Sequence, residues 1–108
     1  MRMKQINLEK RKQFIEELRE EIIEQERIIK LIESYKPTSL EERIIHEYAI
    51  EGNVSLVADK LNKEGLRIGN RKYISNDISA VLKQKPMDDL HQIVKKSFEH
   101  NKAGLRYF

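Results

Sequence analysis

The chain has 108 residues, of which 39% are hydrophobic and 36% are charged, and its formal net charge is +3. This length suits one small domain with a long helical arm, and the composition is too apolar for a disordered chain. The absence of cysteine excludes disulfides and thiolate metal sites, and because neither a membrane-length apolar run nor a signal-peptide core is found, we expect a cytoplasmic protein without a membrane partner.

Residues 8–35 are expected to form one long helix, because they contain no glycine or proline and consist mostly of strong helix formers. Asn7 is a suitable N-cap, and Pro37 ends the helix. A seven-residue apolar repeat, typical of a coiled coil, places six residues along one seam: Leu8, Ile15, Leu18, Ile22, Ile29 and Ile32. We expect residues 1–36 to be an oligomerisation segment, with packing of the helix on its own domain as the alternative.

The charges beside this seam favour an antiparallel pair of helices. A parallel pair would set Glu21 against Glu26 of the partner helix. In the antiparallel register the flanking positions form two opposite-charge pairs and one apolar pair, namely Lys12–Glu33, Arg19–Glu26 and Phe14–Tyr35. A homo-oligomer with antiparallel helices is therefore expected.

Residues 37–86 are expected to form a compact module of three short helices. Ser39 and Glu42 make a capping box at the start of the first helix, which stops before Gly52. Asn53 can cap the second helix, and Gly65 terminates it.

The connection to the third helix contains Gly69 and Asn70 within an alternating stretch, which predicts a short hairpin or an extended turn. Ser75 is expected to cap the third helix, which Pro86 ends.

Residues 87–108 are expected to add one more helix, from about Asp88 to Lys102, so the predicted fold is all-α. The last residues are unusually apolar. We expect Leu105, Tyr107 and Phe108 to dock on the module, on a neighbouring chain or on a partner protein.

Catalysis finds little support in the sequence. The histidines His46, His91 and His100 are scattered and do not have metal-ligand spacing. No glycine loop for phosphate and no nucleophile elbow is found. We expect no enzyme activity, no cofactor and no metal site.

Positive charge is concentrated in one stretch of the chain. Residues 66–86 carry five Lys or Arg against one Asp, whereas residues 37–65 carry three basic residues against six acidic ones. In the helix-turn-helix plan, the last helix enters the DNA major groove with its N-terminal residues on base edges. The predicted DNA-binding residues are Arg67, Arg71, Lys72, Ser75, Asn76, Ser79, Lys83 and Lys85. The alternative is a solvated loop with ordinary surface lysines.

A resemblance to a known family supports the DNA-binding interpretation. The stretches 57–65, 71–75 and 78–82 resemble the helix-turn-helix of bacterial and phage DNA-binding proteins. They are most similar to the DNA-binding segment of large serine recombinases, in which a glycine-terminated helix precedes a basic turn and a last helix that starts with an aromatic residue and serine. The resemblance spans about 45 of the 108 residues and implies double-stranded DNA binding by the last helix, without recombinase activity, because the catalytic domain is absent.

The sequence therefore predicts a sequence-specific DNA-binding regulator of transcription or of a phage or mobile element, which acts as a dimer or higher oligomer. The alternative belongs to another class: an adaptor or anti-factor that holds a partner protein through the long helix and the apolar tail. Binding to phosphates should weaken steeply as salt rises, whereas apolar docking should not.

Overall fold

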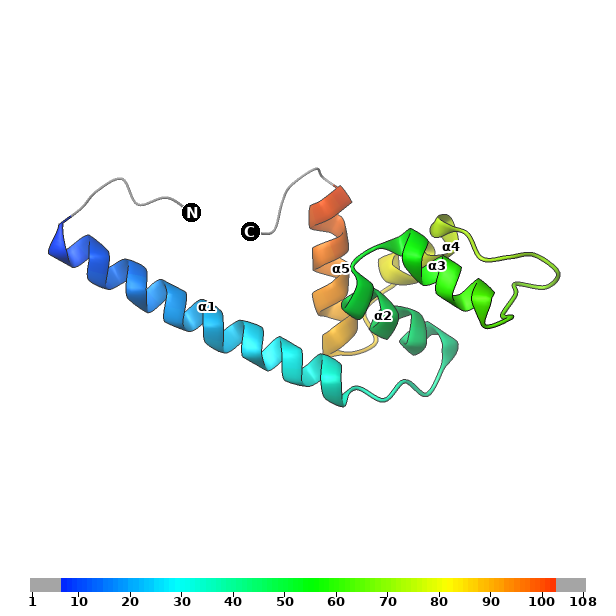
Figure 1. Ribbon diagram of the computed structural model, residues 1–108, viewed down its shortest axis with the longest axis horizontal. Helices are drawn as coiled ribbons and strands as arrows, with labels where there is room; N and C mark the ends of the chain where they lie inside the picture. The colour runs from blue at the N-terminus through cyan, green and yellow to red at the C-terminus, as the bar shows by residue number, and fades with distance from the viewer. Residues whose placement is uncertain (1–6, 103–108) are drawn as a thin grey trace. The chain divides into compact units, whose positions relative to one another are not determined.

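The computed structural model describes residues 7–102, with side chains to residue 100. The described chain is all-helical, as predicted (Figure 1). Its helices are α1 (Leu8–Ser34), α2 (Leu40–Glu51), α3 (Val54–Lys63), α4 (Ser75–Lys83) and α5 (Asp89–Lys102). The chain divides after Ser34 into α1 and a compact unit that begins at Tyr35. The expected docking of Leu105, Tyr107 and Phe108 lies outside the described residues.

Helix α1 begins and ends close to the predicted positions. The Asn7 side chain accepts a hydrogen bond from the Lys10 backbone N–H at 2.9 Å, so it caps the helix as expected. The helix ends at Ser34, one residue earlier than predicted, and none of its residues is buried. No helix in residues 7–102 combines the length and the apolar character that a membrane span requires.

The starts of α2 and α3 use the expected caps. Ser39 Oγ accepts from the Glu42 backbone N–H at 3.1 Å, and Asn53 Oδ1 accepts from the N–H groups of Ser55 and Leu56. The Glu42 carboxylate accepts hydrogen bonds from the backbone N–H and the hydroxyl of Thr38, rather than from the backbone N–H of Ser39 as a capping box would require. Between the two helices, Gly52 adopts a left-handed conformation with φ of 69°, which only glycine adopts readily.

The connection between α3 and α4 contains the predicted turn. A single antiparallel bridge joins Ile68 and Arg71 through two backbone hydrogen bonds of 2.8 and 3.0 Å. Gly69, inside the turn, has φ of 60°. The Asn62 side chain holds the end of the connection, because its amide nitrogen donates to Tyr73 O at 2.9 Å and its oxygen accepts from Tyr73 N–H at 2.7 Å.

The expected cap of α4 is wrong. Ser75 is the first helical residue, and the capping position belongs to Ile74, whose backbone is extended and whose side chain cannot accept a hydrogen bond. Asp77 stabilises this end instead, because its carboxylate accepts from the Ile74 backbone N–H at 2.8 Å. The Ser75 hydroxyl lies 2.9 Å from that of Ser55, at the start of α3.

Helices α2, α3, α4 and α5 share one core, so α5 belongs to the compact unit rather than forming a segment apart. The core consists of apolar side chains that recur at helical spacing on each helix, together with one tyrosine from the connection: Ile44, Ile45, Tyr48, Val57, Ala58, Leu61, Tyr73, Ile78, Leu82, Leu90 and Val94. Most of these positions follow the apolar periodicity of the sequence.

One buried polar residue fixes the connection between α4 and α5. His91 is fully buried, its Nδ1 accepts from the Met87 backbone N–H at 3.1 Å, and its Nε2 lies 3.2 Å from Leu82 O. Because Nδ1 is an acceptor, Nε2 carries the proton and donates to the Leu82 carbonyl. The ring therefore provides hydrogen-bond partners for two backbone groups at the connection between α4 and α5.

Candidate functional site

Two acidic residues of the compact unit form ion pairs within the fold. The Glu47 carboxylate is contacted by Lys60 Nζ at 2.8 Å and by Arg43 at 3.6 Å, and Arg43 also pairs with Glu64. Two acidic residues, Glu47 in α2 and Glu64 just after α3, are thus tied to cations of the two helices. These contacts raise the pKa of Arg43, chiefly through the hydrogen bond to Glu64. Arg43 and Lys60 therefore act within the fold.

The basic stretch 66–86 contains a single acidic residue, and the fold uses it internally. Both oxygens of Asp77 accept hydrogen bonds from the Arg71 guanidinium, at 2.8 and 2.9 Å. The Arg71 hydrogen bonds, followed by the Ile74 N–H, lower the pKa of Asp77 to about 2. Its side chain is 17% exposed, whereas that of Arg71 is 52% exposed. The one negative charge of this stretch is therefore paired with the Arg71 guanidinium.

Other cations of the same stretch are exposed. Arg67, Lys72 and Lys85 are exposed and form no ion pair with any acidic residue in the described part of the chain. The Arg67 guanidinium donates to the backbone carbonyls of Asn62 and Leu66 at 3.2 and 2.7 Å. These side chains leave positive charge on the surface around α4.

Helix α4 presents one polar face to solvent. Ile78 and Leu82 point into the core, and the helical spacing of 100° per residue places Asn76, Ala80 and Lys83 on the opposite face, where all three are exposed. Ser75 and Ser79 lie on one flank and are half-buried. The outward face therefore begins with an amide and contains a small methyl group in its second turn.

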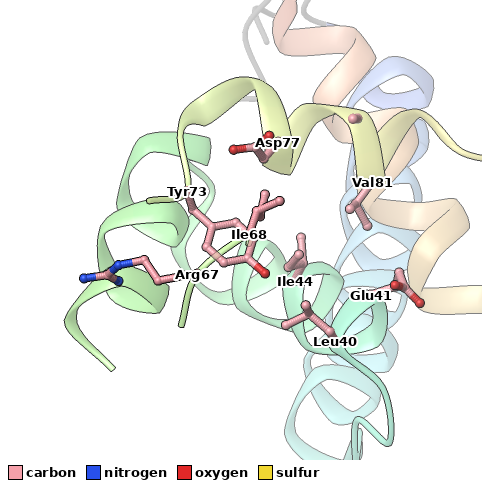
Figure 2. Close-up of a pocket in the computed structure, with 9 residues that line it drawn as sticks. Leu40, Glu41, Ile44, Arg67, Ile68, Tyr73, Asp77 and Val81 are labelled. Atoms are coloured by element: carbon pink, nitrogen blue, oxygen red, sulfur yellow. The ribbon is translucent and has the colours of Figure 1, made fainter. Parts of the chain in front are cut away.

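An apolar groove lies along the other flank of α4. It has a volume of about 400 Å³ and is formed by the first residues of α2, the 66–73 connection and α4. Figure 2 shows the Tyr73 ring beside Ile68 in its centre, with Asp77 above and the Arg67 side chain extending away. Nine residues line it: Leu40, Glu41, Ile44, Arg67, Ile68, Tyr73, Asp77, Ala80 and Val81.

The predicted DNA-binding residues all lie on α4 and its two flanking connections, but they differ in exposure and in the contacts of their side chains. Six are exposed and two, Ser75 and Ser79, are half-buried. Arg71 is held by Asp77, and the Ser75 hydroxyl lies beside that of Ser55. Among the predicted residues at the start of α4, Lys72 and Asn76 are exposed without such a side-chain contact in the described part of the chain. Ala80 was not predicted, although its place four residues after Asn76 could have identified it from helical spacing.

The histidines do not assemble into a site. His91 is buried in the core, and His46 stacks against Tyr35 with ring centroids 5.3 Å apart. Within the described residues, no group of three or more histidine, aspartate and glutamate side chains is placed to hold a metal ion.

Comparison with known proteins found no relative of this chain. The chain matches no family model, no curated protein and no solved structure.

Proposed function

We propose that this chain is a sequence-specific double-stranded DNA-binding protein that inserts α4 into the major groove and acts as a dimer or higher oligomer. Regulation of transcription, or of a phage or mobile element, is the role that fits such a module. The observation that carries the proposal is the outward face of α4, with its amide and methyl groups beside exposed cations, while the only acid of that stretch is bound by Arg71.

The side chains have different roles in this proposal: phosphate contact, base contact and positioning of α4. Arg67, Lys72 and Lys85 contact phosphates, which provides affinity for any duplex. Asn76 has the amide that pairs in a bidentate manner with adenine, and the Ala80 methyl group fits against the thymine methyl group. Arg71 is a positioning residue, because it holds Asp77 and thereby the first turn of α4.

Fluorescence anisotropy with duplexes selected from fragmented bacterial and phage DNA tests the proposal. Lys72→Ala should weaken binding to all duplexes alike and reduce the slope of log affinity against log salt by about one unit. Asn76→Ala should cost about 1–3 kcal/mol on the preferred duplex and much less on others.

Lys96→Ala, which removes the same charge from an exposed position of α5, is the matched control and should bind as wild type does. If Lys72→Ala and Lys96→Ala leave binding equally intact, the surface around α4 is not the interface. Binding to a protein with no salt dependence, and none to DNA, would favour the adaptor alternative instead.

A further inference from the structure

Helix α1 carries a long apolar stripe that nothing within its own unit covers. Its 27 residues include no buried side chain, and Ile15, Leu18, Ile22 and Ile29 are 48, 41, 57 and 51% exposed. These four residues occupy the seam of the seven-residue repeat. An apolar seam of this length is the feature that a second helix covers in a coiled coil.

We propose that α1 pairs in antiparallel orientation with α1 of a second copy of this chain, in the register that sets Leu18 against Ile29 of the partner copy. The proposal deepens the oligomeric part of the proposed function. The experiments that test it contain no DNA, so they can succeed or fail whether or not the chain binds DNA.

The seam of this register is apolar apart from its centre. Ile15 lies against Ile32 of the partner copy, Leu18 against Ile29, and Ile22 against Gln25. Each contact occurs twice because of the two-fold axis. Arg11, the basic residue of the seam, would require a partner at position 36, which lies beyond the last helical residue, Ser34. The same holds for Leu8, which was predicted as part of the seam.

The flanking charges agree with the seam. In this register Lys12 lies beside Glu33 of the partner copy, and Arg19 lies beside Glu26. Arg19 already contacts Glu16 of its own helix at 2.8 Å, in an exposed pair that exchanges easily. Both partner contacts are attractive, and each also occurs twice.

Two competing arrangements place like charges together. A parallel pair sets Arg11 against Arg11 in the seam and Glu21 against Glu26 beside it. The antiparallel register shifted by one heptad sets Leu18 against Ile22, and it brings Arg19 against Arg19 and Glu21 against Glu21. The proposed register avoids both conflicts.

One contact expected from the sequence does not form part of the proposal. Tyr35 was predicted to pair with Phe14 of the partner helix, but it lies outside α1. Its hydroxyl hydrogen-bonds the Asp88 carboxylate at 2.6 Å, and its ring stacks on His46. Burial and the Asp88 contact raise the pKa of the Tyr35 hydroxyl well above its usual value. Tyr35 therefore serves the compact unit.

Disulfide trapping with the full-length chain tests the register, and the chain is suited to it because it contains no cysteine. Leu18→Cys and Ile29→Cys are prepared separately and oxidised alone or as a mixture. We expect crosslinked dimers in the mixture only, each containing one copy of each variant. Dimers in the separate Leu18→Cys sample would show a parallel pair and overturn the proposal. A mixture without heterodimers would overturn the register.

A charge exchange provides a second measurement that does not alter the seam. Arg19→Glu should weaken the dimer roughly three- to tenfold in sedimentation equilibrium, because two attractive contacts become repulsive. Adding Glu26→Arg to the same chain should restore the dimer, whereas adding the control Glu20→Arg, on the outer face, should restore it less. Equal restoration by both would mean that position 26 does not face position 19, and the proposal would fail.

Discussion

Asp77 determines how α4 begins. Its carboxylate accepts one hydrogen bond from the Ile74 backbone N–H and two from Arg71, so it joins the first turn of α4 to the preceding connection. The negative charge also lies near the N-terminus of the helix, where the helix dipole favours it. Asp77 thus holds Arg71 and the Ile74 backbone in place.

Replacing Asp77 with asparagine should make the stability of the fold less dependent on pH in the acidic range. Because the pKa of Asp77 falls from 3.8 to about 2 on folding, its ionised form stabilises the protein above pH 4, and this contribution is lost as the pH falls through about 2. Asp77→Asn should therefore unfold at lower urea concentration than wild type at pH 6, and this difference should shrink at pH 2.

Asparagine keeps an acceptor for the Ile74 N–H, so the comparison isolates the charge. Asp59→Asn, at an exposed position of α3, is the matched control. If the difference in urea midpoint between wild type and Asp77→Asn is the same at pH 6 and pH 2, the role given to the Asp77 carboxylate is wrong.

Single residues also mark the limit of the sequence prediction. Asn7, Ser39 and Asn53 were identifiable as caps because each precedes a helix and has a short side chain that accepts hydrogen bonds. Ser75 has the same chemistry, yet it caps nothing, since the start of α4 depends on a three-dimensional contact with Arg71. The burial of His91 could not be predicted either, because its partners, Leu82 O and Met87 N–H, are brought to it by a chain reversal.

At the scale of elements, the connection between α3 and α4 is held by a side chain rather than by a sheet. The single bridge between Ile68 and Arg71 closes the turn locally, but Asn62 attaches the end of the connection to α3 through two hydrogen bonds with the Tyr73 backbone. Tyr73 is buried, so these backbone groups have little access to water. The amide group of Asn62 therefore fixes the connection to α3 just before α4 begins.

Replacement of Asn62 with alanine should cost about 1–3 kcal/mol of the free energy of unfolding, because it leaves a backbone donor and acceptor without partners. It should also weaken DNA binding more than this loss of stability explains, since α4 loses its fixed start. Urea unfolding and anisotropy of the same preparation measure both effects. Gln92→Ala, at an exposed site of α5, is the control, and equal stability of the two variants would refute the role of Asn62.

At the scale of the whole molecule, the apolar repeat predicted α1 and its exposed seam, and the periodicity of the shorter helices predicted most of the core. The sequence could not predict that Tyr35 leaves the helix, because its partners, His46 and Asp88, are distant in the chain. The inclusion of α5 in the compact unit is a similar case. Its apolar face was visible, but the surface that it covers is formed by α2 and α4.

The proposed pairing of α1 has a consequence for the proposed DNA binding. In the proposed register, Ser34 of one copy lies level with residue 13 of the other, so the two points where the chain leaves the paired helices are about 21 residues, or roughly 32 Å, apart. Successive major grooves on one face of DNA are about 34 Å apart, and a two-fold dimer favours inverted half-sites. We therefore expect inverted half-sites with centres about 10 base pairs apart to be bound most tightly.

Duplexes with two inverted half-sites at centre-to-centre spacings of about 5, 10, 15 and 20 base pairs measure this preference, with one half-site as the reference. Arg19→Glu, which weakens the pairing but leaves α4 unchanged, should bind the single half-site as wild type does and show a smaller preference for spacing. If wild type binds all spacings equally while disulfide trapping supports the antiparallel register, the α1 pair does not set the distance between half-sites.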